Sequence, residues 1–151
     1  MNRCRELGWR LLRNQRVAIS AGESGFDLAG IDDEASHLLG SGERRKERLD
    51  RALRGRDPSR PVVLLAHRPR AFAYACKLGV DLQLSGHTHG GQIWPGYWVV
   101  RLRDRWVAGH FCSGGSQLYV SRGTGSFGPP YRLGSPTEIT ELILRCGEAG
   151  R

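Results

Sequence analysis

The chain has 151 residues, of which 39% are hydrophobic and 25% are charged. This length and composition predict one globular domain with room for a hydrophobic core, and they exclude a wholly disordered chain. No stretch is long and apolar enough to span a membrane, and the charged N-terminus lacks the apolar core of a signal peptide. We therefore expect a soluble chain without a membrane segment.

The formal net charge is +8, and only two of the 23 basic residues are lysines. The arginines are spread along the whole chain, so the sequence predicts no specific nucleic-acid site. A basic surface does favour anionic substrates such as phosphate esters.

Four widely spaced cysteines exclude a disulfide scaffold and a zinc ribbon. We expect reduced, mostly buried thiols in an intracellular protein at Cys4, Cys76, Cys112 and Cys146.

The first third of the chain predicts a short helix over 3–13, from leucines at helical spacing. Strands are expected over 16–20 and 26–33, where the intervening GESG turn favours a hairpin. A highly charged amphipathic helix is expected over 42–54, ended by GRDPSRP.

A parallel βαβ unit is the natural reading of the next segment. VVLLAH at 62–67 is a continuous apolar run, typical of a strand buried on both faces. A helix over 69–79 begins with Pro69 and ends at Gly79, and VDLQLS at 80–85 is the next strand.

Short strands separated by turn residues are expected in the remainder of the chain. The apolar runs predict them at 96–102, 105–111, 117–123 and 136–144, before a loose tail at 146–151.

Three histidines are placed where chemistry is expected. His67 ends the first strand of the βαβ unit, and His87 and His89 follow the second. The carboxyl ends of parallel strands form the usual ligand-binding edge of a sheet, so the three imidazoles should meet there. An H-x-H pair alone is a weak signal, but its combination with His67 and the adjacent glycines favours a site for a divalent metal ion.

The other histidines carry no predicted role. His37 is expected in a loop, and His110 in a strand. A metallo-β-lactamase-like site is excluded because the pattern H-x-H-x-D-H is not met: HTHGGQ has neither the Asp nor the third His.

The segments LLAHRPRAF and GVDLQLSGHTHGGQIWP resemble the last two metal-binding motifs of the calcineurin-like metallophosphoesterases, in the branch with G-H-T-H-G-G-Q. Segments 7–19, 26–33 and 118–144 resemble further parts of that family, so the resemblance covers nearly the whole chain.

The resemblance implies a metal-dependent hydrolase of phosphodiesters or phosphomonoesters. The family holds two divalent ions, here Mn, Zn or Fe, and a metal-bound hydroxide attacks phosphorus. Carried over to this sequence, His67 and His87 would share one ion and His89 would hold the other. No catalytic residue beyond these metal ligands is assigned in this chain.

The family's D-x-H, G-D-x-x-D and G-N-H-[DE] motifs are absent from the sequence. They include the bridging aspartate and the histidine that assists the leaving group. Asp27, Asp32 and Asp33 are not expected to replace these ligands.

The resemblance also implies a fold. The family forms an α-β-β-α sandwich of two mixed sheets, and residues 1–145 correspond to its C-terminal half. We therefore expect a fragment whose partner is the missing N-terminal half of the domain, with weak stability and negligible activity alone. The cellular location stays open, because many full-length relatives carry a membrane helix upstream.

An alternative function is a non-catalytic, basic interaction or regulatory fragment. It predicts no metal-dependent hydrolysis and salt-sensitive binding to an anionic partner.

Overall fold

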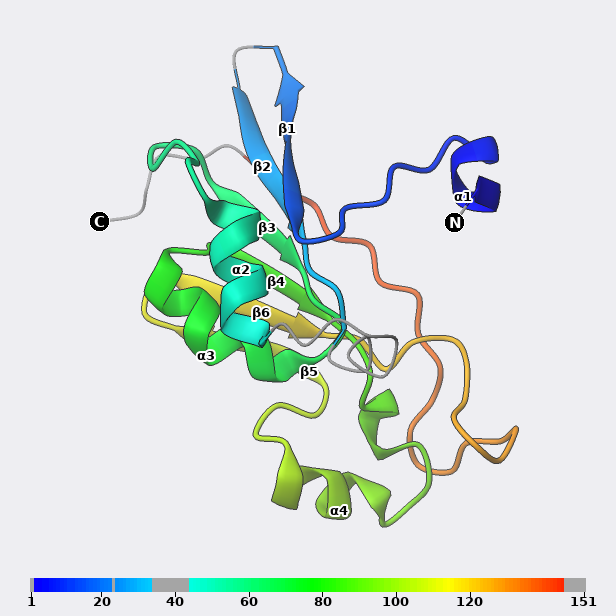
Figure 1. The fold of residues 1–151 in the computed structure, drawn as a ribbon. Helices are drawn as coiled ribbons and strands as arrows, with labels where there is room; N and C mark the ends of the chain where they lie inside the picture. Colours follow the sequence, from blue (N-terminus) through cyan, green and yellow to red (C-terminus); the bar gives the residue numbers. More distant parts are fainter. Residues whose placement is uncertain (1, 23, 34–43, 146–151) are drawn as a thin grey trace.

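The computed structural model describes residues 2–22, 24–33 and 44–145, and its centre is one six-stranded sheet (Figure 1). The strand order is β1-β2-β3-β4-β6-β5. β2, β3, β4 and β6 run parallel to one another, and β1 and β5 pair antiparallel at the two edges. The strands are β1 Gln15–Ala21, β2 Ser24–Gly30, β3 Val62–Leu65, β4 Leu82–Ser85, β5 Gly109–Ser113 and β6 Ser116–Val120. The predicted α/β class is confirmed.

The helices are short and connect the strands. They are α1 Asn2–Glu6, α2 Arg45–Leu53, α3 Phe72–Ala75 and α4 Gly96–Arg103, with 3₁₀ turns η2 Pro69–Ala71, η3 Cys76–Leu78 and η4 His89–Gly91. In Figure 1, α2 and α3 lie together against the sheet, whereas α4 lies apart from them. Every helix in the described ranges is too short or too polar to cross a bilayer.

Two predicted units are confirmed. β1 and β2 form the hairpin, with Ala21 opposite Ser24 at its end. β3, the η2-α3-η3 helix and β4 form the parallel βαβ unit. The helix begins at Pro69, and Gly79 in the left-handed region ends it.

The core lies between one face of the sheet and the helices α2 and α3. Leu49 and Ala75 from the helices pack with Val62 and Leu64 from β3, and all four are buried. Arg48 is also buried and donates hydrogen bonds to the carbonyls of Asp32 and Asp33, 3.0 and 2.7 Å away. Arg48, on α2, therefore holds the segment that follows β2 in place.

The predicted strand at 96–102 is wrong, because these residues form α4. The β-branched and aromatic side chains of this run favour a strand, but a strand needs a hydrogen-bonded neighbour. The sheet in the described residues is already bounded by β1 and β5. Pro95, directly before the helix, restricts the backbone at its start.

The predicted strand at 136–144 is also wrong, since this segment has no regular secondary structure and pairs with no strand of the described sheet. Tyr119 nevertheless holds it by hydrogen bonds to Glu138 and Thr140 of 2.9 and 3.0 Å. The strand at 105–111 is shifted, because β5 begins only at Gly109. The N-terminal helix is shorter than expected, since Gly8 at φ +75° follows its end.

The expectation of mostly buried thiols is wrong for the described cysteines. Cys4 and Cys76 are half-buried, and Cys112 is exposed. Cys4 lies on the short N-terminal helix α1 and Cys112 on the edge strand β5, where few neighbours cover a side chain. The loop prediction for His37, the tail at 146–151 and Cys146 lie outside the described residues.

Candidate metal centre

Hydrogen bonds between the loops that follow β3 and β4 place His67 beside His87. The two strands are in register, with Leu65 opposite Leu84. The ladder continues beyond them: Ala66 N donates to Leu84 O at 3.1 Å, and Gly86 N donates to His67 O at 3.0 Å. The segments that follow β3 and β4 therefore leave the sheet side by side at its carboxyl edge.

The two imidazoles face each other with their nitrogens. His87 Nδ1 lies 3.2 Å from His67 Nε2, and the ring centroids are 5.0 Å apart with a 73° interplanar angle. Two imidazole nitrogens that bind one ion at about 2.1 Å, in tetrahedral or octahedral geometry, are about 3.0–3.4 Å apart. The pair thus fits one divalent ion, and the same distance also suits an N–H···N hydrogen bond between neutral rings.

The surroundings of His87 favour its neutral form. Burial lowers the pKa of His87, and the positive charge of Arg68 and the neighbouring His67 lower it further. Asp33 and Asp104 oppose this shift without reversing it. A neutral imidazole has a free lone pair, which is the state that a metal ion binds.

His89 does not join this pair. Its Nδ1 lies 3.1 Å from Nη2 of Arg132, and its carbonyl accepts a hydrogen bond of 2.7 Å from Ser135 Oγ. Arginine only donates, so Nδ1 of His89 accepts and its proton is on Nε2 in the neutral ring. Within the described residues, no three His, Cys, Asp or Glu side chains are grouped closely enough to hold an ion. All three histidines nevertheless line one cavity, and the assignment of His89 to a separate ion stays a prediction.

The loop that carries His87 and His89 has an unusual backbone conformation. His87, His89 and Gln92 all have positive φ, at 71°, 51° and 52°. Each such non-glycine residue costs on the order of 1–3 kcal/mol, and such residues persist only where their surroundings impose the conformation. Side chains that point in fixed, unusual directions are typical of functional sites.

Close packing explains the two glycines of this loop. A Cβ on Gly91, which has φ +85°, would lie 2.2 Å from the backbone nitrogen of Tyr97. A Cβ on Gly90 would lie 2.5 Å from Ser135 Oγ. The loop is thus packed tightly between α4 and the segment around Ser135. This packing fixes the backbone at His87 and His89.

Two anchors that the sequence did not reveal hold the loop. Thr88 is buried and donates through Oγ1 to the carbonyl of Val107. Gln92 is buried too: its amide nitrogen donates to the carbonyls of Phe127 and Pro129, and its Oε1 accepts from the amide of Phe127 at 2.6 Å. A glutamine directly after two glycines is the only sequence signal of this role.

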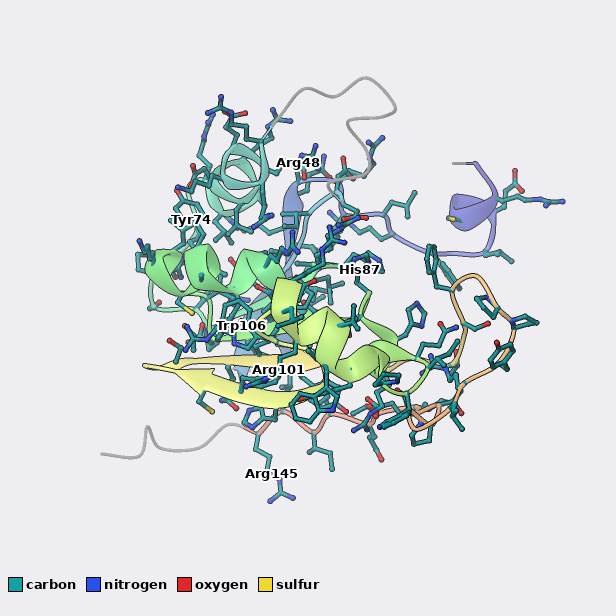
Figure 2. All side chains as sticks on the ribbon, turned by 90° about the horizontal axis from the view of Figure 1, so that it is seen from below. Arg48, Tyr74, His87, Arg101, Trp106 and Arg145 are labelled. Carbon is teal, nitrogen blue, oxygen red and sulfur yellow. The ribbon has the colours of Figure 1, made fainter. Side chains whose placement is uncertain are left out.

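The histidines line an open cavity of about 790 Å³. Figure 2 shows the labelled His87 among the side chains of this region. The remaining walls come from the loops after β2 and β3, from α4 and from the 127 loop, including Asp33, Arg68, Arg70, Val99, Val100, Arg103 and Phe127.

Asp27, Asp32 and Asp33 have other partners. Asp27 is buried and ion-paired with Arg16 and Arg60. Asp32 pairs with Arg13, and Asp33 with Arg68. Asp33 is the one that also lines the cavity. His110 is exposed on β5, 2.9 Å from Gln117, and lines no part of this cavity.

Several known proteins are similar to this chain along most of its length. The bovine "Transmembrane protein with metallophosphoesterase domain" is 39% identical over 144 residues, which is 89% of this chain and 32% of that protein. An uncharacterized metallophosphoesterase of Aquifex aeolicus is 37% identical over 145 residues, covering 93% of this chain and 52% of that protein. One from Helicobacter pylori is 44% identical over 98 residues, covering 64% and 26%.

The chain thus spans between about a quarter and a half of the length of these relatives. No family model and no solved structure matches the sequence. The named relatives agree with one another, and they agree with the resemblance of the histidine segments. The chain belongs to the metallophosphoesterase family.

Proposed function

We propose that this chain contributes part of the metal centre of a phosphoric ester hydrolase that acts on phosphodiesters or phosphomonoesters. The observation that supports it best is the 3.2 Å separation of His67 Nε2 and His87 Nδ1, at the carboxyl ends of two adjacent parallel strands. These two atoms would hold one divalent ion, Mn, Zn or Fe, and His89 would hold a second.

When bound, such a pair of ions supplies a hydroxide nucleophile and stabilises charge on the phosphoryl oxygens. This chain would keep the histidine ligands at the right spacing and in a state that binds metal. The lowered pKa of His87 favours its neutral ring, and the Gly86–His67 backbone hydrogen bond fixes the spacing of the two loops.

His89 must change its contact before it can serve as a ligand. Binding through Nδ1 would displace Nη2 of Arg132. Binding through Nε2 would move the ring proton to Nδ1, where it would face the guanidinium hydrogens. Either route breaks the contact between Arg132 and His89, so we propose that the second ion binds together with a movement of Arg132.

We also propose that residues 1–145 form part of a domain that a further segment completes. The face of the sheet opposite α2 and α3 is apolar and incompletely covered, and Leu65 on it is exposed. It borders a second cavity of about 540 Å³, which Leu11, Leu28, Leu65 and Leu84 line. The greater length of the relatives supports the same view.

Assays of the 151-residue chain with manganese and bis(p-nitrophenyl) phosphate test this proposal. We expect negligible turnover, because the described residues supply no bridging carboxylate at the histidine pair. We also expect weak manganese binding by equilibrium dialysis, lost in His67→Ala and kept in the control His110→Ala. Turnover that disappears in His89→Ala would show that the chain holds a complete site. Binding that His67→Ala leaves unchanged would overturn the assignment.

A further inference from the structure

Helix α4 exposes an apolar surface that the described part of the chain does not cover. It has eight residues and none of them is buried. Trp98 is 63% exposed, Leu102 is 88% exposed, and Trp94, just before the helix, is 69% exposed. A surface helix of a globular protein normally packs its apolar stripe on the core. Figure 1 shows α4 set apart from α2 and α3.

The exposed residues form one stripe between two arginines. At 100° per residue, Trp98, Leu102 and Val99 fall within an arc of about 100°, and Arg101 and Arg103 flank this arc on its two sides. Both arginine side chains are exposed, and the structure gives them no acidic partner in the described ranges. The neighbouring Asp104 pairs with Arg70 instead. We call Trp98, Val99, Leu102 and the two arginines the α4 surface.

This pattern is that of a helix that lies in the interface of a membrane. Such helices bury an apolar face at the boundary between headgroups and acyl chains, while arginines beside it reach the phosphates. Tryptophan is enriched at this depth because its ring is apolar and its N–H is polar. The net charge of +8 adds attraction to an anionic bilayer. A nucleic acid would use the arginines and the aromatic rings, whereas the aliphatic side chains of Val99 and Leu102 favour acyl chains.

The α4 surface is continuous with the cavity of the histidine pair. Val99 and Arg103 belong to both, and Val100 lines the cavity from the same helix. Phe127, which also lines the cavity, is exposed too. A helix that lies flat in the interface would therefore bring His67 and His87 to the level of the lipid headgroups.

We infer that α4 docks this protein on an anionic phospholipid bilayer and presents the histidine cavity to phosphate esters of membrane lipids. The docking stands on the surface of α4 alone, whereas the lipid substrate rests on the proposed hydrolase function.

Co-sedimentation of the 151-residue chain with vesicles tests the docking. Without added metal, we expect the chain to bind vesicles of phosphatidylglycerol and phosphatidylcholine and to bind pure phosphatidylcholine at least tenfold more weakly. Binding should weaken as salt rises. The double variant Trp98→Ser/Leu102→Ser and the variant Arg101→Glu should each reduce the partition coefficient at least tenfold.

Two control variants make the same kinds of substitution at exposed positions outside α4. Ile139→Ser alters an exposed aliphatic residue in the C-terminal segment, and Lys77→Glu reverses an exposed charge on η3. Both should bind vesicles like the unchanged chain, and circular dichroism should show the same fold for all variants. His87→Ala should also bind normally, so loss of metal binding in this variant is separate from docking.

Three results would overturn the inference. The first is that the unchanged chain does not bind the anionic vesicles. The second is that the α4 variants and the controls weaken binding equally, since net charge alone would then explain it. The third is that sedimentation velocity shows a dimer that Trp98→Ser/Leu102→Ser dissociates, because a second copy would then cover this surface.

Discussion

The guanidinium of Arg132 contacts the imidazole of His89, with Nη2 lying 3.1 Å from Nδ1, whereas His67 and His87 contact each other. The same guanidinium donates to the carbonyl of Arg122 at 2.7 Å and to that of Gly125. One side chain therefore ties the histidine loop to the segment after β6.

Replacement of Arg132 should loosen this connection. We expect Arg132→Met to destabilise the protein by about 1–3 kcal/mol, because several carbonyl acceptors lose a charged donor. Urea unfolding followed by circular dichroism measures this change. The control Arg54→Met, at an exposed position after α2, should change the free energy of unfolding by less than about 0.5 kcal/mol. Equal effects of the two variants would show that Arg132 does not anchor the loop.

Gly91 should not tolerate even a methyl group. In Gly91→Ala the new Cβ would lie 2.2 Å from the backbone of Tyr97, and φ of +85° would be strained as well. We expect a loss of about 3 kcal/mol or more, together with displacement of α4.

Gly114 is a matched control because it also has positive φ, at +58°, but a Cβ there would meet no atom within 4 Å. Gly114→Ala should therefore cost only the conformational part, about 1–2 kcal/mol. Thermal unfolding of both variants checks the difference, and a Gly91→Ala variant no less stable than Gly114→Ala would refute the packing argument.

The local sequence predicts much of the structure at the carboxyl edge of the sheet, where the histidines lie. The apolar run at 62–65 and the punctuation by Pro69 and Gly79 predict the βαβ unit, and the unit brings the loops of His67 and His87 together. The contact between His89 and Arg132 does not follow from local sequence, because 43 residues separate the two. The contact of Gln92 with Phe127 is not predictable for the same reason, because 35 residues separate them.

The strand predictions fail where pairing decides the structure. The runs at 96–102 and 136–144 have the residues of strands, yet neither pairs with a described strand, and the first forms α4. Intrinsic preference for a strand is weak compared with the hydrogen bonds and packing that a neighbour supplies. No local pattern specifies which neighbour is present.

Glu138 should make stability depend on pH in the acid range. Burial raises the pKa of Glu138, but the amide of Arg122, the hydroxyl of Tyr119 and the guanidinium of Arg122 all donate to the carboxylate, and the pKa lies below its ordinary value of 4.5. A carboxyl group with a lowered pKa in the folded state stabilises that state above its unfolded pKa. This contribution is lost as pH falls through 4.5 toward the folded value.

Urea unfolding between about pH 3 and 6 tests this dependence. Glu138→Gln should lose stability at pH 6 and should show a weaker decline below pH 4.5 than the unchanged chain. Glu141→Gln serves as control, because Glu141 is exposed and the structure shows no hydrogen bond to it in the described part. An identical decline with and without the Glu138 carboxylate would contradict the expectation.

The most direct test of the account is whether His67 and His87 bind one and the same ion. Cobalt(II) titrations followed by visible absorption would compare the unchanged chain with His67→Ala, His87→Ala and the double variant, and with His110→Ala as control. Because the two nitrogens lie 3.2 Å apart, we predict that each single variant weakens binding at least tenfold and that the double variant is little weaker than either. Additive losses, or unchanged binding in His87→Ala, would show that the two histidines do not share an ion.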